Sequence, residues 1–269
     1  AFLDKEAESR KEKAINLAKQ HGYKIKPLNI NYSEMTWKII DDETLVAPLT
    51  TIKGLGDAAI DEIIEKRPFA SAEDLLFDKG VVARKLNKKS LDALCRSNAM
   101  KDLIDERFSG SRHFWSAVVV DKPKTKKKLN ENIEKYLPEG DFTKNEFIEH
   151  ITALTGIYPL DLVVPEDLLA KFERKGLPPI SEYLESDEDF CWCIPIAVNS
   201  KKTKNKKWYH VVTVIDSNSV QLQIRCWNIG ADWKDQPDVN VPYFLKPRYD
   251  ENWGFSTNGR IDESWARLA

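Results

Sequence analysis

The sequence predicts a multi-domain α+β protein, with a helical front domain, a helical connector and a small antiparallel β-barrel. Apolar residues recur at helical spacing through most of residues 1–188, with glycine or proline at the stops. From residue 190 onward the apolar residues alternate with period two, as in short strands. We expect the three parts to span residues 1–107, 108–188 and 189–269.

The front domain opens with a charged amphipathic helix. Leu3–Gln20 places alanine and leucine along one side, and Gly22 ends the pattern. A proline then favours an extended segment over Tyr23–Ile30. Two short strands are predicted next, at Met35–Ile40 and Leu45–Ala47.

A hairpin between two short helices follows, with Leu55 held between Gly54 and Gly56. Glycine on each side lets the turn take backbone angles barred to other residues and lets a phosphate approach closely. The second helix is predicted at Asp57–Lys66, and its first amides face outward at the positive end of the helix dipole. Such a turn suits gripping a nucleic-acid backbone without reading bases. The alternative is an ordinary tight connection in which the glycines serve only sterics.

Two capped helices complete the front domain. Ser71 is a suitable N-cap for Ala72–Leu76 because Asp74 lies in the first turn. Asn87 is expected to cap a second helix at Lys88–Ser97.

In the connector, Val118–Val120 is expected to be a strand or a buried connection, and Lys122–Lys128 an exposed basic loop. Helices are predicted at Phe147–Leu154 and Pro165–Arg174, with a last turn at Ile180–Leu184. For the basic loop, a solvated state is favoured over contact with a duplex backbone. Its charges are Lys122, Lys124, Lys126, Lys127 and Lys128.

The β part begins with Cys191 and Cys193, which lie two positions apart on a predicted strand, so both side chains point into the barrel. On an open five-stranded barrel of the OB type, the loop between the first two strands and the neighbouring strand face form a groove for single strands. That loop is rich in lysine, at Lys201, Lys202, Lys204, Lys206 and Lys207.

Aromatic residues follow the lysine-rich loop. Trp208, Tyr209 and Trp227 offer flat faces for stacking bases, and Arg225 is expected on the same side of its strand as Trp227. The alternative is a solvated hairpin tip whose aromatic residues serve packing.

Composition limits the remaining function classes. The net charge of -2 gives no global basic signature, so any nucleic-acid surface must be local. No apolar run is long enough to span a bilayer, and no secretory leader opens the chain. Four cysteines without framework spacing favour a reduced, cytoplasmic setting. Because the chain begins at Ala1 rather than methionine, we expect a fragment or a processed piece.

The sequence predicts no active site. Cys191 and Cys193 lack a second pair of zinc ligands nearby, and the four histidines are scattered. No GxxxxGK[ST] motif occurs, and no aspartates stand out as ligands for the two magnesium ions of nucleotidyl transfer.

The front third resembles a known family. Ile25–Ser33, the two short strands, Ile52–Gly56 and Asn87–Leu94 follow the order seen in bacterial C-family replicative polymerases, the alpha subunits of DNA polymerase III and their phage relatives. In that family the run closes the fingers region and forms the helix–hairpin–helix domain that holds duplex DNA. Farther on, Leu154–Asp161 is similar to the segment that leads into an OB-fold domain near the single-stranded template, and Phe190–Asn228 is similar to that OB fold.

The resemblance implies the DNA-binding C-terminal portion of a DNA-directed DNA polymerase, a nucleotidyltransferase whose Mg²⁺-dependent catalytic region lies before Ala1. The implied partners are duplex DNA, single-stranded DNA, and a sliding clamp or other replisome subunits, with no membrane. Two features depart from the family. Tyr158 replaces its usual histidine, and no clear glutamine-led clamp-binding pentapeptide lies between Leu103 and Thr152. By the same analogy, Ile52 and Gly54 would hold K⁺ or Na⁺ through their main-chain carbonyls.

The sequence thus assigns two sets of DNA contacts. Main-chain atoms of the hairpin would hold the duplex, aided by two cations after it, at Lys53, Gly54, Leu55, Gly56, Asp57, Lys66 and Arg67. The barrel would hold single-stranded template through Lys201, Lys202, Lys204, Lys206, Lys207, Trp208 and Arg225. Two alternatives stay open: a stand-alone repair or recombination factor with the same modules, and a replisome scaffold whose barrel binds protein.

Overall fold

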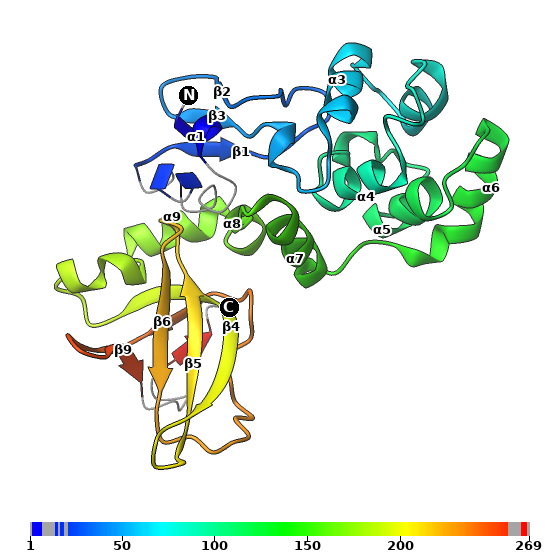
Figure 1. Cartoon of the computed structure of the whole chain (residues 1–269). Coiled ribbons are helices and arrows are strands. Elements are labelled where there is room, and N and C mark those ends of the chain that lie inside the picture. The colour runs from blue at the N-terminus through cyan, green and yellow to red at the C-terminus, as the bar shows by residue number, and fades with distance from the viewer. Residues whose placement is uncertain (1, 7–13, 16, 19–20, 258–264, 268–269) are drawn as a thin grey trace. The chain divides into compact units, whose positions relative to one another are not determined.

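The computed structural model describes residues 2–6, 14–15, 17–18, 21–257 and 265–267 (Figure 1). The chain divides into two compact units, residues 1–158 and 159–269. The predicted α+β class is confirmed, with a helical first unit and a curled sheet in the second. The boundaries predicted at residues 107 and 188 divide the chain by sequence pattern and stay a prediction. Within the described residues, no helix has the length and apolarity needed to cross a bilayer.

Unit 1 is built from short helices around a small sheet. Its elements, with η marking 3-10 or π-helical turns, are α1 (Phe2–Lys5), β1 (Lys24–Lys26), β2 (Lys38–Ile39), β3 (Thr44–Val46), η1 (Leu49–Thr51), α3 (Asp57–Lys66), η2 (Asp74–Asp78), α4 (Lys88–Arg96), η3 (Lys101–Leu103), α5 (Ser111–Trp115), η4 (Ser116–Val120), α6 (Lys126–Tyr136), η5 (Leu137–Glu139) and α7 (Lys144–Thr155).

The first predicted elements of unit 1 are present in shorter form. Residues 2–5, 14–15 and 17–18 are helical, while the rest of the predicted Leu3–Gln20 helix lies outside the described residues. The two predicted strands are β2 and β3, which pair antiparallel, and β1 joins β3 in parallel on its other side.

Local capping rules place the next helices well. α3 spans the predicted Asp57–Lys66, and α4 begins where Asn87 accepts a hydrogen bond from the Ser90 amide at 3.1 Å. Ser71 likewise accepts from the Asp74 amide at 3.2 Å, at the start of the helical turn that continues into η2. A hydrogen-bonded cap of this kind contributes about 1 kcal/mol, which is why these boundaries follow from sequence.

One hydrophobic core fixes α3 and α4 beside the hairpin. Ile60 and Ile63 of α3 are fully buried, as are Leu91 and Leu94 of α4, and all four belong to the same cluster. Each such side chain stabilises the fold by about 1.5–3 kcal/mol through removal of its surface from water. The same core takes in Leu55, which anchors the bend between the two glycines.

Two expectations for the connector region are met only in part. Val118–Val120 lies in the π-helical turn η4, which continues α5, so the strand alternative is wrong, whereas Val118 and Val119 are buried, as the other alternative expected. The reason is tertiary: Asn132 of α6 donates to the carbonyls of Ala117 at 3.0 Å and Asp121 at 2.6 Å, which satisfies backbone groups at the widened turn.

The basic segment is also more ordered than predicted, since Lys126–Lys128 forms the first turn of α6 rather than a loop. Thr125 caps this helix by accepting from the Lys128 amide at 3.1 Å. Leu129 and Ile133 then bury its inner face in the unit 1 core. The helix was not predicted because its first turn contains only lysines and its buried apolar residues begin at Leu129.

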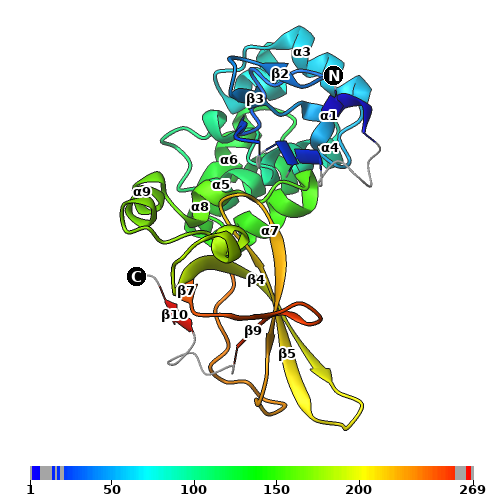
Figure 2. The same cartoon turned by 90° about the vertical axis from the view of Figure 1, so that its left-hand side faces the viewer.

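Unit 2 carries short helices followed by a sheet (Figure 2). Its elements are α8 (Leu160–Val163), α9 (Glu166–Arg174), η6 (Ile180–Glu185), β4 (Cys191–Lys202), β5 (Trp208–Ile215), β6 (Gln221–Cys226), β7 (Tyr243–Leu245), β8 (Arg248–Asp250), β9 (Gly254–Thr257) and β10 (Trp265–Arg267). The predicted helix after Pro165 and the turn after Pro179 are confirmed as α9 and η6.

The sheet curls into a half-barrel, consistent with the predicted OB-like barrel. Its seven strands follow the order β10-β7-β4-β5-β6-β9-β8. All pairs are antiparallel except β6 with β9, which are parallel. Cys191 and Cys193 are both fully buried in the barrel core with Val212, Ile224 and Cys226, so the predicted inward direction of the two cysteines is confirmed.

Candidate nucleic-acid interface

The predicted hairpin joins the short turn η1 to α3 in unit 1. Gly54 has φ +89°, a left-handed conformation that side chains rarely adopt, so the bend requires glycine there. Gly56 has φ -86° and ψ 155°, ordinary extended backbone open to any residue. The expectation that both glycines supply barred angles is therefore right for Gly54 and wrong for Gly56.

Gly56 has open space where a side chain would lie. A Cβ atom at this position would have no atom of the protein within 4 Å among the described residues. Neither backbone angle nor internal packing therefore explains a glycine at position 56. Its effect is to leave the surface of the bend bare beside the first turn of α3, where a ligand can approach the backbone closely.

The amides of the bend fall into two groups. Lys53 donates to the Leu154 carbonyl at 2.8 Å and Leu55 to the Ile52 carbonyl at 3.1 Å, so these two amides hold the hairpin together. Three others predicted as contacts, those of Gly54, Gly56 and Asp57, have no acceptor among the residues that the structure describes, and neither does Ala58. Gly56 is the N-cap of α3 and supplies no side-chain oxygen to that first turn.

These free amides lie at an exposed, electropositive position. Gly54, Gly56, Asp57 and Ala58 are all exposed. The amides at the start of α3 carry the positive end of its helix dipole, which attracts anions. The exposed Asp57 side chain adds one negative charge at the same turn.

Lys89 lies beside the bend, a position that was not predicted from the sequence. The Cε atom of Lys89 lies 3.3 Å from the position of a Cβ atom on Gly54. Lys89 is exposed and stands in the first turn of α4. The predicted helix at Lys88–Ser97 could have indicated that Lys89 lies at a helix start, but its proximity to Gly54 depends on how α3 and α4 pack.

The two cations predicted to aid the hairpin lie elsewhere. Lys66 and Arg67 are at the far end of α3, about 14 Å along the helix axis from its start. Arg67 donates to the Glu34 carboxylate at 2.6 Å and to the Ser33 carbonyl at 2.9 Å, and its side chain is 15% exposed. Lys66 forms an ion pair with Glu65 at 3.0 Å. The structure therefore does not bring Lys66 and Arg67 to the bend.

The two carbonyl oxygens assigned to a monovalent cation differ in whether they already accept a hydrogen bond. Ile52 already accepts from the Leu55 amide, which leaves one lone pair of its carbonyl oxygen. The Gly54 carbonyl accepts no hydrogen bond from the described residues. Both are backbone carbonyl oxygens, a ligand type that K⁺ takes, and each keeps a lone pair that no described residue uses.

In unit 2 the predicted lysines lie on the hairpin between β4 and β5. Lys201 and Lys202 end β4, and the turn from Thr203 to Lys207 closes with a hydrogen bond from the Thr203 amide to the Lys207 carbonyl at 2.8 Å. All five lysines of this hairpin are exposed. The predicted lysine-rich tip thus forms an ordered turn.

Strand register separates the aromatic residues onto two faces. Tyr209 lies opposite Lys201, and it stacks on Trp227 with ring centroids 4.8 Å apart and an interplanar angle of 23°. Arg225 pairs with Val211 one row along the same face. Trp208 points to the opposite side, where the Lys202 ammonium lies 4.3 Å from its ring centroid.

Arg225 and Trp227 donate hydrogen bonds within the protein. Arg225 donates to the Trp253 carbonyl, and the Trp227 amide donates to the Thr257 carbonyl at 3.1 Å. Arg225 and Trp227 remain half-buried rather than enclosed. The stacked Tyr209–Trp227 pair with Lys201 is therefore an accessible platform. The contacts predicted from the sequence include Trp208 but omit Tyr209 and Trp227.

Metal binding and thiol chemistry were also considered for the described residues. No three His, Cys, Asp or Glu side chains there lie together as a metal site. Burial raises the pKa of Cys226 to about 12, and it also raises the pKa of Cys191 and Cys193, so these thiols are protonated at neutral pH.

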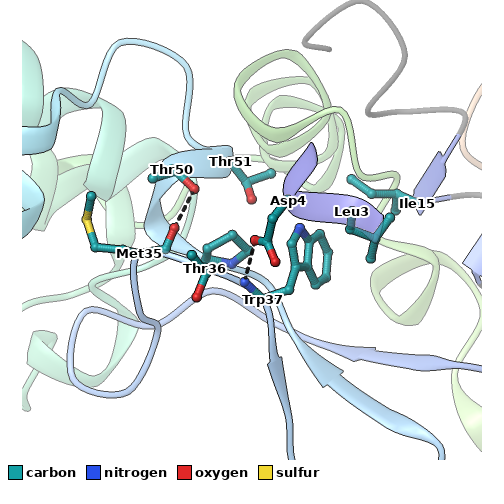
Figure 3. Close-up of a pocket in the computed structure, with 9 residues that line it drawn as sticks. Leu3, Asp4, Ile15, Met35, Thr36, Trp37, Thr50 and Thr51 are labelled. Carbon is teal, nitrogen blue, oxygen red and sulfur yellow. Dashed lines mark hydrogen bonds between the residues drawn. The ribbon is translucent and has the colours of Figure 1, made fainter. Parts of the chain in front are cut away.

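A pocket of about 220 Å³ lies in unit 1, and two hydrogen bonds join residues of its lining (Figure 3). Asp4 accepts from the Trp37 amide at 2.9 Å, and Thr50 donates to the Met35 carbonyl at 2.9 Å. The rest of the pocket lining combines the apolar Leu3, Ile15 and Pro48 with Thr36 and Thr51.

A family model matches part of the first unit, and curated relatives match about a third of the chain. A family model described as a helix-hairpin-helix motif matches residues 22–109. DNA polymerase III PolC-type of Lacticaseibacillus paracasei is 34% identical over 91 residues, which is 32% of this chain and 6% of that protein. PolC-type polymerase of Staphylococcus epidermidis is 30% identical over 95 residues, which is 34% of the chain and 6% of the relative.

A relative of the other polymerase type matches too. DNA polymerase III subunit alpha of Pseudomonas fluorescens is 34% identical over 76 residues, 28% of this chain and again 6% of the relative. The chain thus spans only a small part of the length of these curated relatives. The resemblance to the C-family replicative polymerases is confirmed for the helix–hairpin–helix region of this chain.

Proposed function

We propose that this chain is the DNA-binding C-terminal portion of a C-family replicative polymerase. In this proposal the hairpin of unit 1 holds the backbone of the primer–template duplex, and the β4–β6 face of unit 2 holds single-stranded template. The observation that carries it is that four exposed residues of the bend, Gly54, Gly56, Asp57 and Ala58, have amides with no acceptor among the described residues.

The chemistry of the bend suits a phosphate. Backbone amides at the start of a helix donate to anionic oxygens without any sequence readout. The bare surface at Gly56 lets a phosphate come within hydrogen-bond distance of the backbone. Lys53 within the bend and Lys89 beside Gly54 add exposed positive charge. Arg67 is left out of this contact because Glu34 and Ser33 hold its guanidinium.

A monovalent cation completes the proposed site. The carbonyl oxygens of Ile52 and Gly54 would hold K⁺ or Na⁺, which would supply positive charge facing the phosphate. The chain's own contribution is to hold the bend that carries these two oxygens, through the hydrogen bond from the Lys53 amide to the Leu154 carbonyl. The Mg²⁺ ions of nucleotidyl transfer would belong to the catalytic region of the parent polymerase.

In unit 2, bases would stack on the rings of the Tyr209–Trp227 pair, while lysines of the β4–β5 hairpin follow the phosphates. Of the predicted set, Lys201, Lys204, Lys206, Lys207 and Arg225 suit this role. Trp208 is covered on one side by Lys202 and contributes less. A sliding clamp or other replisome subunits remain predicted partners.

Replacement of Gly56 by valine tests the proposal. The backbone angles at Gly56 accept valine and its side chain would meet no protein atom, so the fold should survive. The added methyl groups would hold a phosphate off the amides. We expect the affinity of the Gly56→Val variant for a blunt DNA duplex to fall at least tenfold, about 1.4 kcal/mol, as measured by fluorescence anisotropy.

Gly230→Val is the matched control, because Gly230 also has open space at its Cβ position and no left-handed φ. This control should bind duplex as the parent does. Equal duplex affinity of Gly56→Val, Gly230→Val and the parent would contradict the hairpin contact.

A further inference from the structure

Two basic segments far apart in sequence are packed against each other in unit 1. Residues 79–89 contain five cations and no acidic residue, at Lys79, Arg84, Lys85, Lys88 and Lys89. Residues 122–128 contain five more, again with no acidic residue, at Lys122, Lys124, Lys126, Lys127 and Lys128.

Three hydrogen bonds join these segments directly or through residues that adjoin them. Lys122 donates to the Leu86 carbonyl at 2.9 Å across 36 positions, and Lys88 donates to the Val120 carbonyl at 2.7 Å across 32 positions. Lys126 donates to the Asp78 carboxylate at 2.8 Å. The start of α6 therefore lies along the start of α4 and the end of η2.

Few acidic groups neutralise this accumulation of charge. Lys85 pairs with the buried Glu62 at 2.7 Å, Lys126 with Asp78, and Lys128 with Asp121 at 3.6 Å. In the described part of the chain, the other seven cations, Lys79, Arg84, Lys88, Lys89, Lys122, Lys124 and Lys127, have no ion-pair partner. Like charges packed together destabilise the folded protein by mutual repulsion, which a bound polyanion relieves.

The two basic segments adjoin each other and the bend, because Lys88 donates to the Val120 carbonyl, two positions before Lys122, and the Cε atom of Lys89 lies 3.3 Å from the position of a Cβ atom on Gly54. We name the α4–α6 basic surface as Lys79, Arg84, Lys88, Lys89, Lys122, Lys124, Lys126 and Lys127. We propose that it binds the phosphate backbone of the same DNA duplex as the hairpin and so extends that contact along the DNA, an inference that rests on the proposed function.

The composition of the α4–α6 basic surface favours a duplex backbone over a single strand. Neither basic segment contains an aromatic residue, so neither can stack unpaired bases. Seven of the eight cations are lysines, which act as point charges towards phosphates and give affinity without base specificity. The starts of α4 and α6 add free first-turn amides, since Asn87 and Thr125 each cap only one.

Removal of two charges tests this inference. Lys124 and Lys127 are exposed and unpaired, so Lys124→Gln with Lys127→Gln in the full chain should leave folding intact. The control is Lys101→Gln with Lys144→Gln, two exposed lysines of the same unit outside the surface. The probe is a blunt duplex of about 20 base pairs, roughly two helical turns, titrated by fluorescence anisotropy over a range of NaCl concentrations.

Loss of two phosphate contacts should reduce the slope of log K against log[salt] by about 1.8. A fourfold rise in salt then lowers the parent's affinity about twelvefold more than that of the Lys124/Lys127 variant. The control variant should keep the parent slope. A parent-like slope and affinity in the Lys124/Lys127 variant would overturn the inference.

The Gly56→Val variant separates the two claims. Weakened binding in Gly56→Val but not in the Lys124/Lys127 variant would leave the hairpin contact standing and refute the basic surface. The reverse result would support the basic surface and refute the hairpin contact. If the double variant loses affinity for poly-glutamate while keeping its duplex affinity, the surface binds an acidic protein and the inference is wrong.

Discussion

Lys89 of α4 lies over Gly54 of the hairpin, with its Cε atom 3.3 Å from the position that a Cβ atom on Gly54 would occupy. The left-handed Gly54 thus makes room for a cation at the bend, and the bare Gly56 leaves the neighbouring amides open. Two glycines close together in sequence therefore have different physical roles.

That difference predicts opposite effects on stability. Gly54→Ala should lower the free energy of unfolding by about 1–2 kcal/mol, because alanine is strained at a left-handed φ and would press on Lys89. Gly56→Ala should be neutral or stabilising by up to about 1 kcal/mol, since its angles suit alanine and the unfolded chain loses freedom. Urea unfolding of both variants checks this, and equal destabilisation would show that Gly56 is also structurally required.

Lys89 should contribute directly to duplex binding. Lys89→Gln removes one charge at the bend, so we expect the salt slope for duplex DNA to fall by about 0.9 with unfolding unchanged. Lys101→Gln, an exposed lysine on η3, is the matched control and should keep the parent slope. If the two variants behave alike, Lys89 has no part in the contact.

The two faces of the β4–β5 hairpin predict unequal roles for its aromatic residues. Trp227→Ala should weaken binding of single-stranded DNA by about 1–3 kcal/mol, the range for one lost stacking partner, and Tyr209→Ala should act similarly. Trp208→Ala should cost less because Lys202 covers that ring. Anisotropy with an oligothymidylate measures all three, and a larger loss for Trp208→Ala would reverse this assignment of faces.

Local rules explain which elements the sequence predicts. The bounds of α3 and the caps at Asn87 and Ser71 depend on neighbours within a few positions, so they can be read from the sequence. Period-two alternation likewise placed Cys191 and Cys193 correctly in the barrel core.

The remaining features depend on contacts between distant residues. Arg67 follows a helix and carries a positive charge, but Glu34, 33 positions earlier, holds it within the fold. Val118–Val120 has strand propensity, which Asn132 overrides by satisfying the carbonyls of a π-helical turn. Lys89 reaches Gly54 only because α3 and α4 share one core.

The capping box of α7 predicts a pH dependence of stability. Thr143 donates to Glu146 through its amide and hydroxyl, and with Arg112 these bonds lower the pKa of Glu146 from 4.5 to about 2. A carboxyl group with a depressed native pKa stabilises the fold above its unfolded pKa, and this contribution is lost as the pH falls through the native pKa. The contribution of Glu146 should therefore be complete above pH 4.5 and lost towards pH 2.

Urea unfolding of Glu146→Gln and the parent measures this effect. The variant should be less stable at neutral pH, and the difference should shrink as the pH is lowered from 4.5 towards 2. Glu149→Gln, an exposed position on the same helix, should show no such convergence. A difference that stays constant with pH would mean that the Glu146 charge is not involved.

NMR of the amides in the bend shows whether phosphates bind there. In ¹⁵N-labelled protein titrated with a blunt DNA duplex, the amide signals of Gly54, Gly56, Asp57 and Ala58 should shift strongly. The amides of Lys53 and Leu55, which already donate within the hairpin, should move much less. Duplex binding that leaves the four free amides unshifted would contradict the claim that the backbone of this bend meets the phosphates.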